Sequence, residues 1–201
     1  MRLFIIDTKA CNLNSVVQAL KRLNLEPEVS NDPAELKHAD KYILPGVGTA
    51  SAVMDGIEKF QLKDLILNTK KPLLGICLGM QVQALSSAEV PLECTDREIQ
   101  TLGIIKAKVQ KIDSHGLRLP HMGWNTVEHN EHPLFAGIPQ DSYFYFVHSY
   151  CIPVCENTIG RSEYGMPFSA AVAKDNFMGV QFHPEKSGAI GAKLLQNFIE
   201  L

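Results

Sequence analysis

The sequence predicts an α/β protein with a mostly parallel, doubly wound sheet flanked by helices and extended by antiparallel strands. In the first half, short apolar runs at residues 3–6, 42–44 and 72–76 alternate with segments whose apolar residues have helical spacing. Such alternation favours a parallel sheet with helices on both faces. The second half is a series of short strand patterns separated by turn residues, which predicts the antiparallel additions.

Local signals bound the elements of the first half. Asp32 followed by Pro33 is typical of a helix N-cap with proline at the first helical position. Pro45 and Gly46 end the apolar run before them. A weaker strand is expected at residues 27–29, and the expected helices cover residues 14–23, a short stretch from 33, 50–60, 62–67 and 78–85.

The second half ends in a helix at residues 190–198, because Leu194, Leu195 and Phe198 form one apolar stripe. Before it, the predicted strands cover residues 104–112, 125–127, 143–148, 158–162, 170–173 and 177–181. No linker separates two independent units, so we expect residues 1–201 to form a single domain.

Composition excludes several classes of function. The formal net charge of the 201 residues is -3, and no run of Lys or Arg suggests a nucleic-acid surface. No apolar stretch approaches the roughly 18 residues of a membrane span, and no signal-peptide pattern opens the chain. The odd number of cysteines favours reduced thiols and a cytoplasmic location. The cysteines are Cys11, Cys77, Cys94, Cys151 and Cys155.

Cys77 stands where an apolar strand pattern meets a helical pattern, with Gly75 and Gly79 two residues away on either side. This is the layout of a nucleophile elbow, with cysteine in place of serine. Glycines are needed where a tight turn crowds the backbone. A helix N-terminus beside the sulfur favours the thiolate, and the N–H of Leu78 can face an oxyanion. An isolated cysteine would more often be a buried structural residue.

His183, Pro184 and Glu185 supply a base and a group to orient it. Pro184 keeps His183 out of helical conformation, and residues two apart in extended chain point the same way. One imidazole nitrogen can therefore bind the carboxylate while the other faces Cys77. Alone, the tripeptide could be only a turn.

A glycine loop, Pro45-Gly46-Val47-Gly48, follows the third strand and can present N–H groups. It is neither a dinucleotide-binding nor a Walker motif. We predict no cofactor and no metal site, since the remaining histidine and cysteine pairs lack further ligands at suitable spacing. Those pairs are His129 with His132 and Cys151 with Cys155.

In chain order, the Pro-Gly-Val-Gly, Gly-Ile-Cys-Leu-Gly-Met-Gln and His-Pro-Glu segments resemble those of the class I, or triad, glutamine amidotransferases. The resemblance covers essentially the whole chain. Segments 121–125, 146–150 and 183–187 look like those of the histidine-biosynthesis glutaminases, and so do residues 12–16. The stretch Thr8-Lys9-Ala10-Cys11 departs from the glycine-rich stretch of many members.

The resemblance implies that the chain hydrolyses L-glutamine and that ammonia passes through a tunnel to a separate (β/α)8-barrel synthase subunit, its heterodimer partner. That subunit would make imidazole glycerol phosphate and aminoimidazole carboxamide ribonucleotide. By the resemblance, Cys77 is the nucleophile, His183 the base and Glu185 its orienter, with backbone oxyanion donors at Val47 and Leu78. The implied glutamine contacts are Gly46, Gly48, Gln81, Glu89, Ser149 and Tyr150. The implied synthase contacts are Trp124, Tyr145 and Lys186.

Three alternatives stay open at this point. The chain could serve another synthase, such as the pyridoxal phosphate or anthranilate type, although residues 121–125 argue against both. It could be a non-catalytic scaffold on the same fold. It could also be a cysteine peptidase of a related α/β type, which would usually not need the glycine loop.

We further expect low glutaminase activity without the partner, because the oxyanion loop must rearrange.

Overall fold

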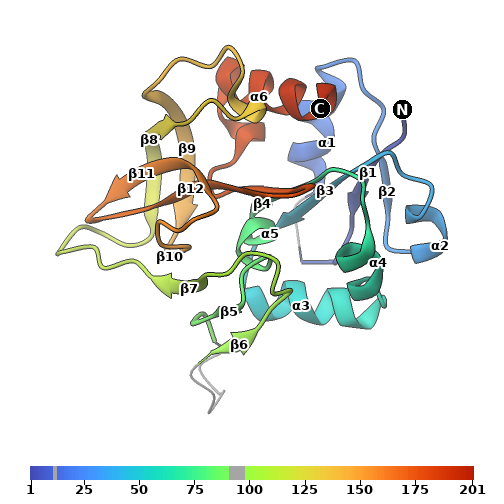
Figure 1. Ribbon diagram of the computed structural model, residues 1–201, viewed down its shortest axis with the longest axis horizontal. Helices are drawn as coiled ribbons and strands as arrows, with labels where there is room; N and C mark the ends of the chain where they lie inside the picture. The colour runs from blue at the N-terminus through green and yellow to red at the C-terminus, as the bar shows by residue number, and fades with distance from the viewer. Residues whose placement is uncertain (11–12, 91–97) are drawn as a thin grey trace.

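A nine-stranded sheet forms the centre of the computed structural model, which describes residues 1–10, 13–90 and 98–201 (Figure 1). Its strand order is β2-β1-β3-β4-β13-β12-β11-β8-β9. The first five strands in this order pair in parallel, and the last four add antiparallel pairs to the same sheet. The predicted fold class is confirmed. The strands are β1 (Leu3–Ile6), β2 (Glu28–Ser30), β3 (Lys41–Gly46), β4 (Leu73–Cys77), β8 (His121–His129), β9 (Ser142–His148), β11 (Thr158–Tyr164), β12 (Met166–Lys174) and β13 (Phe177–Val180).

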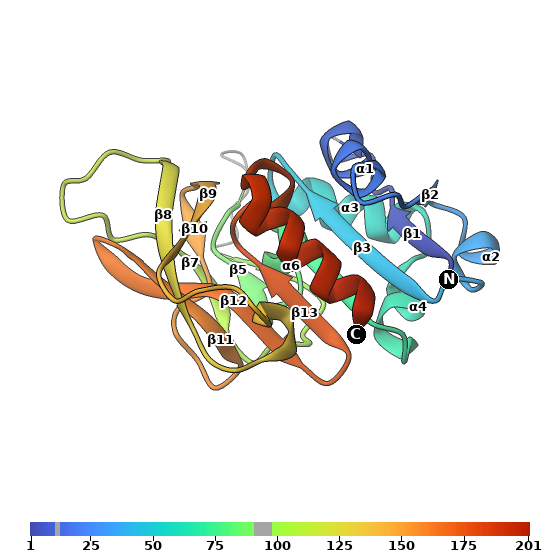
Figure 2. The same ribbon diagram turned by 90° about the horizontal axis from the view of Figure 1, so that it is seen from above.

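Helices cover both faces of the parallel half, as Figures 1 and 2 show from two directions. Alternate residues of each strand face opposite sides, so Ile5 packs in the core beneath α1 and α6, whereas Phe4 packs in the core beneath α3. The helices are α1 (Leu13–Lys21), α2 (Pro33–Leu36), α3 (Ala50–Lys59), α4 (Lys63–Asn68), α5 (Leu78–Gln81) and α6 (Gly188–Glu200), with 3₁₀ turns η1 (Pro133–Phe135) and η2 (Pro184–Lys186).

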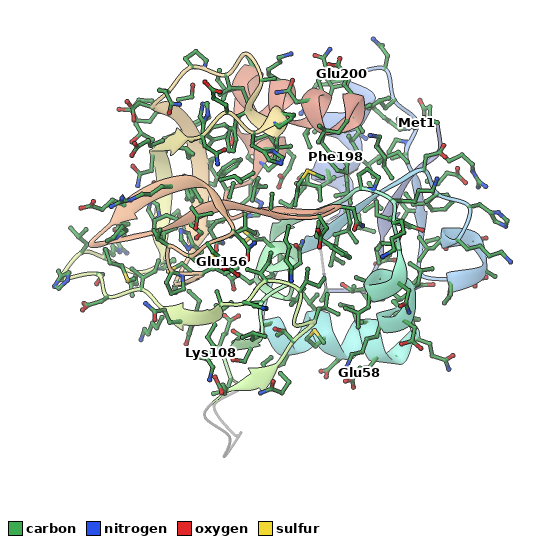
Figure 3. All side chains as sticks on the ribbon, in the orientation of Figure 1. Met1, Glu58, Lys108, Glu156, Phe198 and Glu200 are labelled. Carbon is green, nitrogen blue, oxygen red and sulfur yellow. The ribbon has the colours of Figure 1, made fainter. Side chains whose placement is uncertain are left out.

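The apolar stripes expected from helical spacing face the sheet. Leu194, Leu195 and Phe198 of α6 are fully buried, and α6 lies across the sheet beside β13 in Figure 2. Figure 3 labels Phe198 on this helix and Glu58 on the outer side of α3, pointing away from the sheet. Each of these two helices therefore has one apolar face in the core and one polar face in solvent.

The helix predicted for residues 78–85 ends at Gln81. The backbone carbonyls that follow the helix accept hydrogen bonds from a segment distant in sequence. Leu102 N–H donates to Val82 O, and the N–H groups of Ile104 and Ile105 donate to Gln83 O. These long-range bonds replace the helical ones. The same bonds shorten the strand predicted for residues 104–112, whose extended part is β7 (Lys108–Lys111).

A second, four-stranded sheet has the order β10-β7-β5-β6. It consists of very short strands, and the sequence patterns did not predict β5, β6 or β10. They are β5 (Ser86–Ser87), β6 (Ile99–Gln100) and β10 (Tyr150–Cys151). Across the described parts of the chain, no helix is long and apolar enough to cross a bilayer.

Candidate functional site

Cys77 lies at a strained turn between β4 and α5. Its φ of 55° and ψ of -110° are unusual for a residue with a side chain. A Cβ on Gly75 would come within 2.3 Å of Gly79 O, and a Cβ on Gly79 would come within 1.7 Å of Leu44 O. Both predicted elbow positions therefore require glycine, and the turn has the geometry expected of a nucleophile elbow.

Cys77 lines a cavity of about 340 Å³ at the carboxyl ends of the parallel strands. The cavity brings together most residues predicted for the nucleophile, the base, the oxyanion and the glutamine. Four predicted site residues, Gly46, Trp124, Tyr145 and Glu185, do not line it. The lining residues are Val47, Gly48, Cys77, Leu78, Gln81, Glu89, Pro120, Val147, His148, Ser149, Tyr150, His183 and Lys186.

His183 and Glu185 form a buried pair at the end of β13. His183 Nδ1 lies 2.7 Å from Glu185 Oε1, and the two side chains are only 4% and 5% exposed. His183 is extended, with φ -102° and ψ 95°, as Pro184 predicts. Glu185 differs from the expectation: it is reached through the 3₁₀ turn η2, not through extended chain. The turn still returns the carboxylate to the ring.

The charge on His183 depends on its two neighbours. Burial alone would lower its pKa, but the interactions with Cys77 and Glu185 outweigh burial and raise the pKa to about 10. The raised pKa favours the protonated form of the ring. His183 Nε2 is buried and makes no hydrogen bond to the residues that the structure describes.

The glycine loop has one of its N–H groups engaged elsewhere. Val47 N–H donates to Ala10 O over 3.0 Å. A Cβ on Gly46 would lie 2.8 Å from Leu78 Cβ, whereas Gly48, with a φ of +92°, has open space around it. The loop is thus packed tightly against the elbow at one glycine and free at the other.

The cavity wall around Cys77 carries both an amide side chain, that of Gln81, and a carboxylate side chain, that of Glu89. Gln81 Nε2 donates to Tyr150 O over 2.9 Å. Glu89 Oε2 accepts the backbone N–H of Ala50 over 3.0 Å. Burial raises the pKa of Glu89, and the Ala50 N–H lowers it by less. A carboxylate and an amide in one small cavity suit a zwitterionic amino acid.

Sequence reasoning missed Gln181, which is fully buried beside Cys77. Its Nε2 lies 3.7 Å from Cys77 Sγ, and its Oε1 accepts Gln81 Nε2 over 2.9 Å. The available signal was its position: a polar residue two before His183, directly after an apolar strand. Residues two apart in extended chain share a face.

His121 and His148 form a second buried pair next to the cavity. His148 Nδ1 lies 2.8 Å from Tyr150 O, and His121 Nδ1 lies 3.0 Å from His148 Nε2. A carbonyl only accepts, so both rings carry their proton on Nδ1. Burial lowers the pKa of His121 to about 4 and, with the charges of His121 and His183, that of His148 to about 3.

An exposed aromatic patch lies on β8 and β9 at the outer edge of the sheet. We define it by Met122, Trp124, Tyr143 and Tyr145. The first three are 62%, 55% and 59% exposed, and the Trp124 and Tyr145 rings meet edge to face with centroids 6.0 Å apart. Lys186 Nζ lies 5.8 Å from the Tyr145 ring centroid and also lines the cavity. The patch therefore adjoins the cavity.

The sequence predicts no metal site at the remaining cysteines and histidines. Two of these residues, Cys11 and Cys94, lie outside the described residues. Burial raises the pKa of Cys151 to about 12. His129 stacks on Phe135 with ring centroids 4.4 Å apart. Within residues 1–10, 13–90 and 98–201, no group of three His, Cys, Asp or Glu side chains could hold a metal ion.

Comparison with known proteins points to one family. Residues 4–201 match the family model described as glutamine amidotransferase class-I. The chain is 52% identical, over the full length of both chains, to the imidazole glycerol phosphate synthase subunit HisH of Yersinia pseudotuberculosis and to that of Escherichia coli K12. It is 49% identical to that of Shewanella loihica, covering 98% of this chain and 89% of that protein.

Solved structures share the fold at low sequence identity. A putative GMP synthase protein of Thermoplasma acidophilum superimposes with a TM-score of 0.75 at 20% identity, covering 100% of this chain and 92% of that one. PurLQS of Thermotoga maritima gives a TM-score of 0.71 at 19% identity, covering 99% and 97%. These likenesses support the fold class alone.

Proposed function

Because this chain belongs to the class-I glutamine amidotransferase family, we propose that it is the glutaminase subunit of an imidazole glycerol phosphate synthase in histidine biosynthesis. Its substrate is L-glutamine, and its products are glutamate and ammonia. The observation that carries the proposal is the hydrogen bond of 2.7 Å between Glu185 and His183, which lines one cavity together with the elbow cysteine, Cys77. Full-length identity of 52% to HisH proteins supports the choice of synthase.

Cys77 is the nucleophile and His183 the proton carrier. The Cys77 thiolate attacks the side-chain carboxamide carbon of glutamine: a C–S bond forms, and the carbonyl π electrons move to oxygen. The imidazolium of His183 then gives its proton to the amide nitrogen, the C–N bond breaks, and ammonia leaves. Glu185 keeps the proton-bearing ring oriented throughout. The product of this half-reaction is a glutamyl thioester.

Water completes the cycle. Neutral His183 takes a proton from water, whose oxygen attacks the thioester carbon; the C–S bond breaks, and the thiolate of Cys77 leaves as glutamate forms. The imidazolium and the thiolate are thereby restored. Each turnover consumes one water and releases one ammonia, so atoms and charges balance without a cofactor.

The two tetrahedral intermediates need donors for their oxyanion. Leu78 N–H at the start of α5 and Val47 N–H of the glycine loop are the proposed donors. Val47 N–H is held by Ala10 O, so this half of the oxyanion hole forms only after that bond breaks. We assign its rearrangement to binding of the synthase subunit, which couples glutamine hydrolysis to the presence of an ammonia acceptor.

The remaining predicted residues bind glutamine. Glu89, near the N-terminus of α3, is suited to the α-ammonium group of the substrate. Gln81, Ser149 and Tyr150 lie on the wall that would face its amide and carboxylate. Gly46 and Gly48 keep the loop close to the substrate without side chains in the way.

The partner is a (β/α)8-barrel synthase subunit bound at the aromatic patch. Trp124 and Tyr145 offer large rings at the surface, which are typical anchors of protein interfaces. Lys186 lies between the cavity and the patch, so ammonia leaving Cys77 has a short way to the partner. Residues 1–201 act as one domain, in the cytoplasm, as half of a heterodimer.

The test uses the complex with the barrel subunit and follows imidazole glycerol phosphate. With Cys77→Ala, synthesis from L-glutamine should be lost, while synthesis from added ammonium chloride should continue. Retention of both would remove Cys77 from the mechanism. Loss of both in a folded complex would mean that this chain does more than supply ammonia.

A further inference from the structure

A buried glutamine connects the nucleophilic sulfur to the wall of the glutamine pocket. The register pairs Val180 of β13 with Ile76 of β4, so Gln181 lies level with Cys77 on the neighbouring strand. Gln181 is fully buried, and its amide lies between two groups of the site. Its Nε2 is 3.7 Å from Cys77 Sγ, and its Oε1 is 2.9 Å from Gln81 Nε2.

The hydrogen-bond chain fixes which end of the Gln181 amide faces the sulfur. Tyr150 O is a carbonyl and can only accept, so the Gln81 atom 2.9 Å from it must be the nitrogen. The second N–H of that nitrogen points to Gln181, whose facing atom must then be the oxygen. The remaining end of Gln181 is the NH₂ group, which therefore presents a donor to Cys77.

A donor beside Cys77 Sγ matters because another polar neighbour of the sulfur favours the neutral thiol over the thiolate. Cys77 Sγ also lies 4.0 Å from Val147 O, which accepts from a thiol but repels a thiolate. The N–H of Gln181 stabilises a thiolate, and hydrogen bonds to charged groups are about twice as strong as neutral ones. Because Cys77 is only 6% exposed, solvent screens this difference little.

We propose that Gln181 donates a hydrogen bond that stabilises the thiolate of Cys77 and points it at the substrate, while its carbonyl holds Gln81 in the glutamine pocket. This inference deepens the proposed function and rests on it, since only a reacting thiolate needs the donor. It makes Gln181 a positioning residue for the nucleophile, separate from the oxyanion donors and from His183.

The test compares two buried glutamines. Gln181→Met keeps the length of the side chain but removes the donor. Gln83→Met is the matched control: Gln83 is also fully buried, but its amide donates to the backbone carbonyls of Gly79 and Met178, at 3.3 and 3.0 Å. Iodoacetamide alkylation of Cys77 in the full chain is followed across the pH range in which the chain stays folded. Mass spectrometry of the peptide that contains Cys77 gives the rate at each pH.

In Gln181→Met the midpoint of the alkylation profile should move up by about one pH unit, which corresponds to a tenfold loss of thiolate stabilisation. In the complex, kcat for glutamine should fall about tenfold, and KM should rise as well, because Gln81 loses its acceptor on Gln181. Gln83→Met should keep the wild-type midpoint even where its melting temperature is lower. A general packing defect would move both variants alike.

A folded Gln181→Met with an unchanged midpoint overturns the proposal. Should this variant not fold, Gln181→Glu carries the test alone, because it keeps the shape and an acceptor for Gln81 but faces the sulfur with an oxygen. Its midpoint should rise by at least as much, and an unchanged midpoint overturns the proposal equally. Alkylation needs neither glutamine nor the partner, so a failure of the proposed function appears only in the turnover assay.

Discussion

Val47 N–H donates to Ala10 O over 3.0 Å, and Val47 lines the same cavity as Cys77, the proposed nucleophile. The bond joins the glycine loop after β3 to the segment that follows β1. It engages the N–H group that we propose as an oxyanion donor. Under the proposed function, the isolated chain therefore combines the pair of His183 and Glu185 with an oxyanion hole that is incomplete until this bond breaks.

Amide exchange at Val47 reports this bond directly. In the isolated chain the Val47 amide should exchange slowly, because a hydrogen-bonded amide is protected until the bond opens. Addition of the barrel subunit with its nucleotide substrate should speed exchange at Val47 about tenfold. Tyr42, whose N–H donates to Pro72 O at 2.9 Å in β3, should keep its rate. NMR-detected hydrogen exchange makes the measurement, and unprotected Val47 in the isolated chain would contradict this account.

Glu185→Gln tests the orientation of the base. The amide keeps the shape but lacks the charge that helps to raise the pKa of His183, so the ring loses its fixed tautomer and part of its proton affinity. We expect kcat to fall about a hundredfold to ten-thousandfold, with KM nearly unchanged. Steady-state glutamate release in the complex measures both. A loss below about threefold would show that Glu185 does not orient the base.

The same pair predicts how stability changes with alkaline pH. The pKa of His183 is about 10 in the folded chain, against an ordinary value of 6.5. Its contribution is thus fully present below pH 6.5 and is lost as the pH rises towards 10. Urea unfolding at about pH 7 and about pH 9.5 should show a larger loss of unfolding free energy for the wild type than for His183→Gln. Equal losses would count against the raised pKa.

The pair of His121 and His148 predicts a loss of unfolding free energy in acid, whereas His183 predicts one in alkali. Their pKa values are lowered to about 4 and about 3, so the unfolded chain takes up protons first. Stability is retained above pH 6.5 and lost as the pH falls from there towards 4. The variant His121→Phe should show a shallower acid loss in urea unfolding than the wild type. A matched change at exposed His38 should leave the slope as it is.

Glu89→Gln should weaken glutamine binding more than chemistry. In the proposed function the carboxylate binds the substrate ammonium group, and a hydrogen bond to a charged group contributes about 1.5–3 kcal/mol. We expect KM to rise about tenfold to hundredfold and kcat to change less than about twofold. Glu58→Gln, on the outer side of α3 (Figure 3), is the control and should change neither. A fall in kcat alone would place Glu89 in the chemical step.

The strongest features of the site were readable because they are local. Gly75, Cys77 and Gly79 lie within one turn. A Cβ on Gly75 would clash with Gly79 of the same turn, whereas a Cβ on Gly79 would clash with Leu44 O of β3, a contact that the spacing alone does not reveal. His183 and Glu185 are two residues apart, and Pro184 restricts the chain between them. Spacing of this kind limits the geometry whatever the rest of the fold does, although the 3₁₀ turn at Glu185 was not expected.

The missed features depend on residues far apart in the chain. Gln181 meets Cys77 only because β13 lies beside β4, and these two residues are 104 positions apart. The early end of α5 has the same origin, since backbone N–H groups of residues 102–105 take its next carbonyls. Periodicity reports which face of an element is apolar, but it does not say which distant backbone group will compete for a hydrogen bond.

Glutamate release from L-glutamine by the purified chain, measured with and without the barrel subunit plus its nucleotide substrate, distinguishes a partner-dependent glutaminase from one that works alone. We expect slow release by the chain alone, strong stimulation by the partner, and no release from Cys77→Ala in either condition. Full activity of the isolated chain would contradict the closed oxyanion hole. No stimulation by the barrel subunit would contradict the assignment to imidazole glycerol phosphate synthase.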